Sequence, residues 1–155
     1  MGHMRLLTVG RPRDGHMAAL VDEYLRRINA SWPIRWETVA EVPFRQGDEH
    51  HALRKEEERL LSRIAPQDFV VLLDVSGQLI DSSALAERLA QWRMAGPSVV
   101  LVIGGSLGTG EQVQARAQWR WSLSPLTLPH GLAQVVVAEQ LYRAWTILQG
   151  HPYHK

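Results

Sequence analysis

Residues 98–129 read SVVLVIGGSLGTGEQVQARAQWRWSLSPLTLP, and this stretch decides the fold that we expect. It opens with five apolar residues, 99–103, which predict a buried strand. Gly104, Gly105 and Gly108 follow, and glycine lets a backbone turn tightly or approach a ligand closely. The spacing alone fits a tight strand–helix turn as well as a ligand-binding loop. A Cβ atom at Gly105 is expected to clash with a ligand or to prevent the backbone angle of the turn.

A second loop follows where residues 121–124 lead into residues 125–129. Pro125 and Pro129 enclose this loop, and each proline fixes its own φ angle, so the loop is expected to be stiff. A glycine-rich loop and a stiff proline loop can form two walls of one pocket. The sequence therefore predicts a ligand site between them.

The rest of the chain alternates between the two kinds of secondary structure. Short apolar runs predict strands at residues 5–9, 34–38, 69–73, 99–103 and 119–123. Helical periodicity and capping residues predict helices at residues 15–28, 49–64, 82–95, 112–118 and 132–148. Strict alternation favours an α/β fold with an open, mostly parallel sheet and helices on both faces. The third strand is expected to end at Asp74 and Gly77.

Two of the expected helices have unusual surfaces. The run RKEEER at residues 54–59 is interpreted as a solvated helix face with i, i+4 ion pairs, in preference to an interaction patch. The helix at residues 132–148 is apolar around most of its circumference, so it is expected to be buried on more than one side. A second subunit or another helix of the same chain can cover its outer side.

Composition limits the class of protein. A chain of 155 residues with 45% hydrophobic and 21% charged residues is typical of one globular domain. No apolar run approaches the roughly 18 residues that span a membrane. The absence of cysteine excludes disulfides and thiolate metal sites, and it fits a cytoplasmic location. Residues 1–3 are interpreted as an expression-vector remnant, which leaves one domain at residues 4–155.

Several common functional motifs are absent. The chain has no G-x-G-x-x-G after a strand, no phosphate-binding P-loop and no G-x-S-x-G nucleophile motif. The seven histidines have no neighbouring carboxylates at metal-ligand spacing, so no metal is expected. His130, His151 and His154 differ from the others because they cluster around the proposed site. The net charge of +1 is low for an RNA-binding protein.

Six sequence motifs together resemble one known family. They are LLTVG at 6–10, EYLRR at 23–27, GG-x-x-G at 104–108, WSLS-x-LTLPH at 121–130, VAEQLYRAW at 137–145 and HPYHK at 151–155. The chain resembles, over essentially its whole length, the SPOUT-class methyltransferases that methylate N3 of a pseudouridine in large-subunit ribosomal RNA. The resemblance implies a homodimer, a C-terminal trefoil knot near residues 123–132 and the assembled ribosome as substrate. One departure is Ser106-Leu107, where the family usually has Pro-Glu.

The resemblance also implies that S-adenosylmethionine binds in the predicted pocket. Its expected contacts come from the two loops and from apolar side chains beside them: Leu73, Ile103, Gly104, Gly105, Gly108, Leu123, Ser124, Pro125, Leu126, Thr127, Leu128 and Pro129. Asp74 follows a buried strand, where open α/β sheets place ligands. It is expected either to contact the cofactor or to cap a turn, and both interpretations stay open.

The chemistry on RNA is expected at Arg143 and in the C-terminal tail, residues 151–155. N3 of pseudouridine must lose its proton before it attacks, and histidine titrates near neutral pH, so His154 is the first candidate acceptor. His130 is the second, because it follows the proline loop directly. Arg143 is expected to orient a phosphate or a base carbonyl, because guanidinium does not act as a base. Tyr153 and Lys155 are expected to contact RNA, by stacking on a base and by pairing with phosphate.

The resemblance implies that this tail reaches the cofactor of a second subunit, whereas the alternative for the tail is a frayed chain end. Two other functional classes also stay open. One is a different transferase or an oxidoreductase that holds a nucleotide cofactor in the same glycine loop. The other is a non-catalytic RNA-binding adaptor, which Ser106-Leu107 suggests.

Overall fold

Strands and helices alternate along the chain in the computed structural model, which describes residues 3–29 and 31–155. The strands are β1 (Met4–Val9), β2 (Ile34–Val39), β3 (Phe69–Leu79), β4 (Val99–Ile103) and β5 (Trp119–Ser122). The helices are α1 (Gly15–Asn29), α2 (Glu49–Leu61), α3 (Ser82–Ala95), α4 (Glu111–Arg116) and α5 (His130–Gln149). The predicted order of elements is confirmed. Of the expected vector remnant, residues 1–2 lie outside the described residues, and the His3 carbonyl accepts a hydrogen bond from the Val99 amide.

The strands form one parallel sheet in the order β2-β1-β4-β3-β5. The apolar runs occupy its centre: Leu6 on β1, Leu101 on β4 and Val71 on β3 are fully buried. Strands buried on both faces have continuous apolar sequences, and this explains why the run at residues 99–103 predicts a central strand. The expected open parallel sheet is confirmed.

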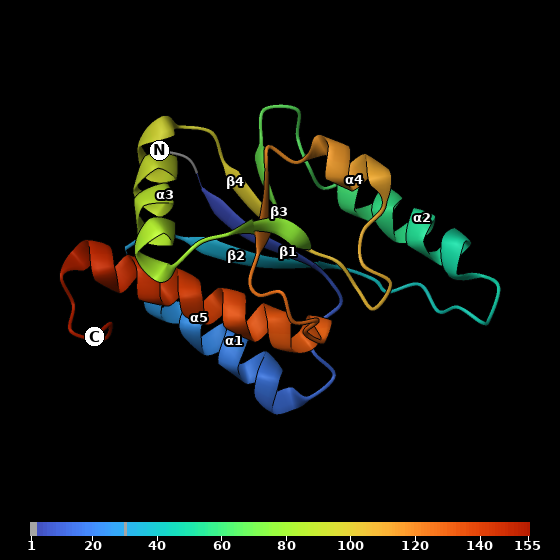
Figure 1. Cartoon of the computed structure of the whole chain (residues 1–155), viewed down its shortest axis with the longest axis horizontal. Helices are drawn as coiled ribbons and strands as arrows, with labels where there is room; N and C mark the ends of the chain where they lie inside the picture. The colour runs from blue at the N-terminus through green and yellow to red at the C-terminus, as the bar shows by residue number, and fades with distance from the viewer. Residues whose placement is uncertain (1–2, 30) are drawn as a thin grey trace.

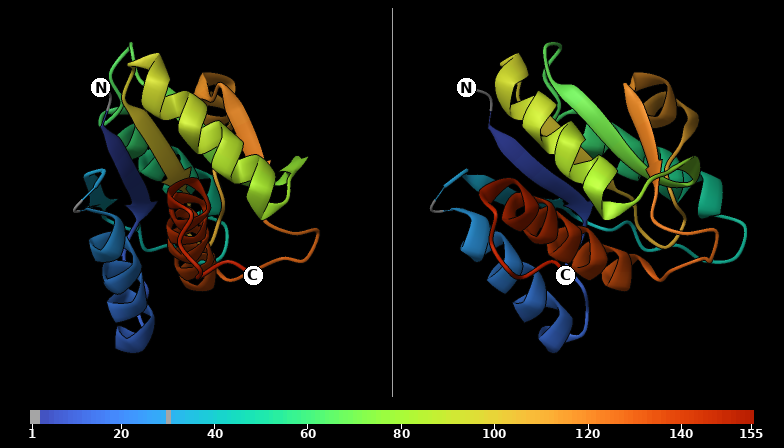
Figure 2. Two further views of the ribbon diagram at one scale, coloured as in Figure 1. Left: turned by 90° about the vertical axis from the view of Figure 1, so that its left-hand side faces the viewer. Right: turned by 60° about the vertical axis from the view of Figure 1, so that its left-hand side comes forward.

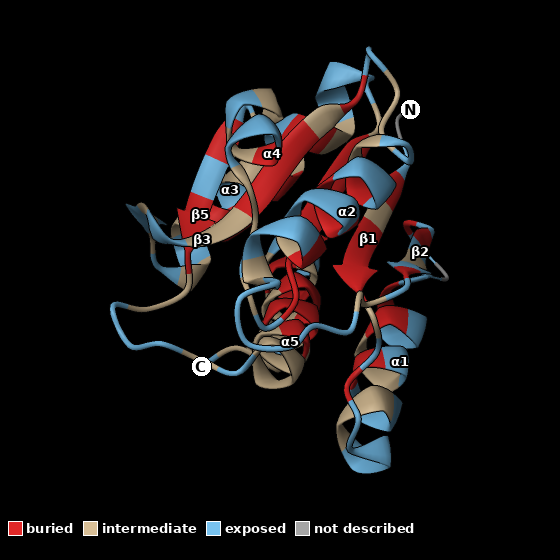
Figure 3. Cartoon of the chain, turned by 90° about the vertical axis from the view of Figure 1, so that its right-hand side faces the viewer, coloured by how far each residue is buried: buried red, intermediate tan, exposed pale blue. Residues whose placement is uncertain are grey.

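Helices cover both faces of the sheet (Figures 1 and 2). α1, α3 and α5 pack on one face, and α2 and α4 pack on the other. α5 lies between α1 and α3, so neighbouring helices of the same chain cover much of its apolar circumference. Its outer side is only partly covered, and Leu148 is 38% exposed. Figure 3 shows the same layering as buried strands beneath helices with exposed outer surfaces.

β3 is longer than the sequence predicts. It does not end at Asp74 and Gly77 but bends there, and Gln78 and Leu79 pair again with β5. The bend needs glycine, because a Cβ atom on Gly77 would lie 2.6 Å from the carbonyl carbon of Arg120. Turn residues thus mark an irregularity inside this strand and not its end. The trefoil knot that the resemblance implies stays a prediction.

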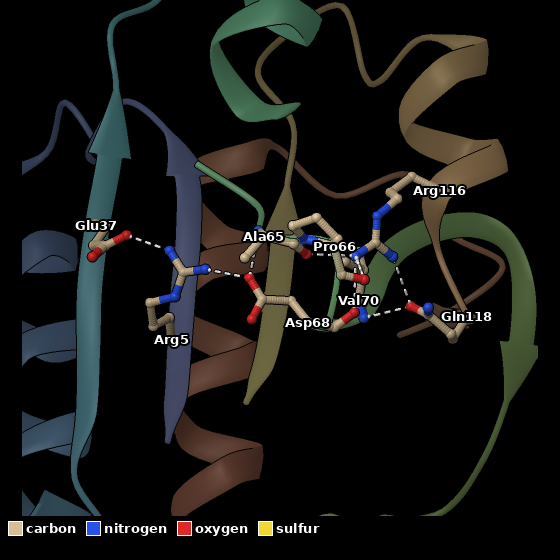
Figure 4. Close-up of polar contacts among 8 residues, drawn as sticks. All are labelled: Arg5, Glu37, Ala65, Pro66, Asp68, Val70, Arg116 and Gln118. Carbon is tan, nitrogen blue, oxygen red and sulfur yellow. Dashed lines mark hydrogen bonds and ion pairs between the residues drawn. The ribbon is translucent and has the colours of Figure 1, made fainter. Parts of the chain in front are cut away.

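Polar contacts join β2, the start of β1 and the segment just before β3 (Figure 4). Arg5 of β1 donates to Glu37 of β2 at 2.7 Å and to Asp68, just before β3, at 2.9 Å. Arg116, at the end of α4, donates to the carbonyls of Ala65 and Asp68, both at 2.9 Å. These contacts tie neighbouring elements of the sheet together, and the candidate site lies at the carboxyl-terminal ends of the strands.

Candidate functional site

A pocket of about 320 Å³ lies at the carboxyl-terminal ends of β3, β4 and β5. The loops after β4 and β5 form two of its walls, and the first turn of α5 closes it. Open parallel sheets bind ligands at this edge, and small-molecule sites are typically about 300–1,000 Å³. We call it the inner pocket.

The inner pocket is lined by every residue predicted to bind the cofactor except Pro125 and Pro129. Sequence reasoning missed other lining residues, which are Val75, Leu107, Thr109, Gln114, Trp121 and Ala133. Thr109 and Gln114 extend the glycine loop into α4, and continuing the motif past Gly108 would have found them. The two prolines hold the second loop without lining the pocket.

The glycine loop folds back on itself. The Gly108 amide donates to the Gly105 carbonyl at 3.0 Å, and Gly108 has a positive φ of 78°, which favours glycine. A Cβ atom on Gly104 would lie 2.8 Å from Thr109 Cγ2 and would also press on the Gly108 backbone. The close contacts at Gly104 and the positive φ at Gly108 explain why the motif has glycine at these two positions.

The reason expected for a glycine at position 105 was wrong. Gly105 does not have a positive φ, and its Cβ position faces the protein interior, 3.1 Å from Val9 Cγ1 and 3.4 Å from Glu56 Oε1. A side chain there would push against the core behind the loop and not against a ligand.

The proline loop is held by short-range hydrogen bonds. Ser122 Oγ donates to the Ser124 carbonyl at 3.1 Å, and Ser124 Oγ accepts from the Leu126 amide at 3.0 Å. Leu126 is 72% exposed beside the pocket, whereas Leu123 and Leu128 are partly buried along it. The loop therefore presents apolar side chains and backbone groups in fixed directions, as its prolines predict.

Asp74 lines the pocket and also closes a turn. Its Oδ1 accepts from the Ser76 amide at 3.0 Å and from Ser76 Oγ at 2.8 Å, and its Oδ2 accepts from Arg120 Nε at 2.9 Å. Burial opposes ionisation, but the hydrogen bonds from Ser76 and Arg120 outweigh it and hold the pKa of Asp74 below its ordinary value. The turn-capping interpretation is confirmed, and the carboxylate remains beside the pocket.

Two glutamates of α2 lie behind the glycine loop, and this corrects the solvated-face interpretation of residues 54–59. Glu56 is 3% exposed and Glu57 is 7% exposed, whereas the other four residues of the run are exposed. Glu57 Oε2 accepts from the Val113 amide at 2.9 Å, which caps α4. Glu56 Oε2 accepts from the Val42 amide at 2.9 Å. A prediction from hydrophobic periodicity assigns charged residues to the solvent-exposed face of a helix. It therefore misses carboxylates that are buried because they bind backbone amides of distant segments.

Glu56 is the more unusual of the two. Its Oε1 atom is buried and makes no hydrogen bond within the described residues. Burial raises the pKa of Glu56 above its ordinary value, although the Val42 amide opposes that shift. A buried carboxyl group therefore lies directly behind Gly105.

His130 begins α5 and lines two pockets. Besides the inner pocket, it borders a second one of about 560 Å³, which we call the outer pocket. Arg13, Glu41, Phe44 and Ser106 are among the residues that line this outer pocket. The histidine expected beside the cofactor loop is thus at the junction of the two cavities.

The other predicted catalytic and RNA-binding residues lie elsewhere in the same chain. Arg143, near the far end of α5, donates to Glu139 at 2.8 Å, contacts His154 Nδ1 at 3.1 Å and lies 4.9 Å from the Tyr153 ring centre. Tyr153 also packs edge-on against Tyr142 at 4.7 Å, so the tail is packed on α5. Residues 130 and 143 are about 20 Å apart along the helix axis. The structure therefore brings Arg143, Tyr153 and His154 together near the far end of α5, whereas the inner pocket of the same chain lies at the first turn of that helix. Figure 1 shows the chain end, C, below the far end of α5.

The part of the chain that the structure describes holds neither a metal-binding cluster nor a membrane-spanning helix. Residues 3–29 and 31–155 contain no cluster of histidine, aspartate or glutamate that could hold a metal ion. Within the same ranges, no helix combines the length and the apolar character that crossing a membrane requires.

Comparison with known proteins gives consistent matches. The family model described as "Predicted SPOUT methyltransferase" matches residues 3–154. The chain is 40% identical over 156 aligned residues to a protein of Hahella chejuensis named ribosomal RNA large subunit methyltransferase H, covering 98% of both chains. A Pseudomonas putida protein of the same name is 39% identical, with 98% of this chain and 99% of the other covered.

A solved structure shows the same fold. It is described as a probable methylase family protein from Haemophilus influenzae, with a TM-score of 0.57 and 12% sequence identity. The alignment covers 99% of this chain and 71% of the other. At this identity the likeness concerns the fold alone.

Proposed function

The chain belongs to the SPOUT methyltransferases, and from this membership we propose that it methylates N3 of a pseudouridine in large-subunit ribosomal RNA, with S-adenosylmethionine as methyl donor. The protein is a methyltransferase, and its relatives are named as enzymes of ribosomal RNA. The observation that carries the proposal is the inner pocket, in which the glycine loop and the proline loop converge.

The residues of the inner pocket fit S-adenosylmethionine. Leu73, Ile103 and Leu128 offer apolar surface for an adenine ring, and the two loops offer backbone groups for its polar edge. Asp74 is the carboxylate beside the pocket, and its low pKa keeps it charged at neutral pH. When bound, S-adenosylmethionine supplies a methyl group activated by a sulfonium.

The protein must position the base and remove a proton from it. N3 lies between two carbonyl groups and carries a hydrogen at neutral pH, so a nearby acceptor accelerates the reaction. Holding N3 in line with the methyl group supplies a further part of the rate. His130 is suited to either task because it lies at the junction of the two pockets.

We propose that Arg143, Tyr153, His154 and Lys155 act on the RNA at the pocket of a second subunit. Within one chain these residues are at the far end of α5, so a homodimer is the arrangement that brings them to a pocket. Guanidinium only donates hydrogen bonds, so His154 Nδ1 accepts from Arg143 in the packed tail. With Nδ1 accepting, the neutral imidazole carries its hydrogen on Nε2, so His154 must leave Arg143 before Nδ1 can accept the N3 proton.

The remaining parts of the proposal concern the domain organisation, the form of the substrate and the cellular location. Residues 4–155 form a single methyltransferase domain, the substrate is the assembled ribosome, and the enzyme acts in the cytoplasm, where ribosomes are modified. The match over residues 3–154 supports the domain assignment.

Two measurements test the proposal. Calorimetry measures binding of S-adenosylmethionine, and a tritium-methyl assay measures transfer to ribosomes that lack the modification. We expect micromolar binding and label in large-subunit RNA. Absence of both cofactor binding and methyl transfer would instead favour a non-catalytic RNA-binding adaptor, the alternative that Ser106-Leu107 suggests.

A further inference from the structure

None of the residues expected to bind the cofactor lines the outer pocket. It lies between the segment after β2, the Arg13 side chain and the tip of the glycine loop. Ser106 lines the outer pocket, while its neighbours Gly105 and Leu107 line the inner one. The two cavities therefore lie on two sides of the same loop, and His130 borders both.

Glu41 is the carboxylate of this cavity. Its Oε1 accepts from Ser106 Oγ at 3.5 Å, and its Oε2 lies 3.5 Å from Arg13 Nη2. Both distances are longer than an ordinary hydrogen bond, so neither contact saturates the carboxylate. The side chain of Glu41 is 30% exposed, and that of Arg13 is 88% exposed. Glu41 thus retains capacity to accept a strong hydrogen bond from a ligand.

The segment that carries Glu41 is held in place by α2. The buried Glu56 accepts from the amide of Val42, the next residue, and Arg59 Nη1 donates to the carbonyl of Ala40, the preceding one, at 2.8 Å. Both backbone neighbours of Glu41 are therefore anchored to one helix. A carboxylate with fixed backbone and weakly engaged oxygens is suited to recognition.

The rim of the outer pocket adds two groups that suit a nucleotide. Phe44 is 39% exposed and offers a ring face for stacking on a base. Arg13 offers an exposed guanidinium for a phosphate. A carboxylate acceptor, a hydroxyl, an aromatic ring and a cation thus surround one cavity.

We propose that the outer pocket holds the target base before the reaction, and that Glu41 accepts the hydrogen bond from N3–H of a uracil-type imide in this docked position. The base leaves this contact before the methyl group and the proton acceptor reach N3. The inference rests on the proposed function, because it places the RNA substrate beside the methyl donor. A carboxylate only accepts, so it favours an imide with a hydrogen on N3. Cytosine has a bare lone pair at N3, which Glu41 repels. Glu41 is therefore a specificity-determining residue that selects uridine or pseudouridine over cytidine.

Titration of nucleotides followed by amide NMR tests the binding directly. With S-adenosylhomocysteine present, pseudouridine 5′-monophosphate is expected to shift the amide signals of Val42, Phe44 and Ser106. Cytidine 5′-monophosphate is expected to bind at least about tenfold more weakly, the size of one hydrogen bond to a charged group. Equal affinity for the two nucleotides, or shifts confined to other parts of the chain, would overturn the inference.

Variants separate the carboxylate from its surroundings. Glu41→Gln offers both a donor and an acceptor, so its preference for pseudouridine over cytidine nucleotide is expected to fall to about twofold or less. Glu58→Gln is the matched control, because Glu58 is an exposed glutamate of α2, and it should keep the wild-type preference. A Glu41→Gln variant that discriminates as the wild type does would refute the role of Glu41.

Methyl transfer distinguishes the inference from the proposed function. If the wild type labels ribosomal RNA and Glu41→Gln does so with unchanged kcat/KM, the inference fails and the proposed function stands. If nucleotide binding follows the expected pattern but the wild type transfers no methyl group, the proposed reaction fails and the base pocket stands. A thermal melt of Glu41→Gln shows whether the variant is folded.

Discussion

Replacing Glu57 by alanine should destabilise the fold and weaken cofactor binding together. Glu57 is 7% exposed, and its Oε2 accepts from the Val113 amide at 2.9 Å in the first turn of α4. No side chain of the Gly110 cap supplies that acceptor. Glu57→Ala therefore leaves a buried amide without a partner.

The expected cost follows from these contacts. A hydrogen bond to a charged acceptor contributes about 1.5–3 kcal/mol, and the lost side-chain methylenes add about 0.8 kcal/mol each, while removing a buried charge offsets part of the loss. We expect the free energy of unfolding to fall by about 3 kcal/mol, which lowers Tm by about 6–12 °C in a domain of this size. Thr109 and Gln114 flank the same turn and line the inner pocket, so affinity for S-adenosylmethionine should fall as well.

Urea unfolding and calorimetry check both expectations. Glu58→Ala is the matched control, because Glu58 is the adjacent, exposed residue and its ion pair with Lys55 spans 3.8 Å. Its free energy of unfolding should change by less than about 0.5 kcal/mol. If Glu57→Ala is as stable as Glu58→Ala, the assignment of Glu57 as the cap of α4 is wrong.

Four further predictions concern the loop, the buried acid, the tail and the dimer. Gly108→Ala should weaken S-adenosylmethionine binding about tenfold in calorimetry, because its φ of 78° strains any residue with a Cβ atom, while Gly15→Ala, in open space, should not. Burial raises the pKa of Glu56 in the folded protein above its ordinary value of about 4.3. Glu56 therefore adds to the free energy of unfolding below about pH 4.3, where it is protonated, and this contribution is lost as the pH rises through the pKa of the folded state. Urea unfolding should therefore show the advantage of the wild type over Glu56→Gln shrinking as pH rises toward neutral, and a constant difference would contradict this. A chain that ends at Gly150 should bind S-adenosylmethionine normally but lose methyl transfer, whereas full transfer would show that the tail has no part in the reaction. Sedimentation should show a dimer that Leu148→Glu weakens, since Leu148 is exposed on α5, and a monomeric wild type would exclude the shared site.

Local sequence predicts the sheet and the inner pocket well, for physical reasons. Residues 99–103 form a central strand because only a strand buried on both faces is apolar at every position. Parallel strands place the loops that follow them at one edge, so the loops after β4 and β5 had to meet there. The positions lining the inner pocket follow from these two facts.

The supports behind the pocket were not predictable in the same way. Glu56 and Glu57 occur in a charged run whose local pattern is that of a solvated helix, and their burial depends on amides at residues 42 and 113. Such long-range contacts leave no periodicity in the sequence. The extension of β3 past Gly77 was missed for a similar reason, because glycine there permits close contact with β5 instead of ending the strand.

Nucleoside mass spectrometry tests the central claim most directly. Ribosomes that lack the modification are incubated with the enzyme and S-adenosylmethionine carrying a deuterated methyl group, and the large-subunit RNA is then digested to nucleosides. The account predicts a labelled N3-methylpseudouridine that forms only with active enzyme. Labelled methyl on a different nucleoside, or no label in large-subunit RNA from an enzyme that binds the cofactor, would contradict it.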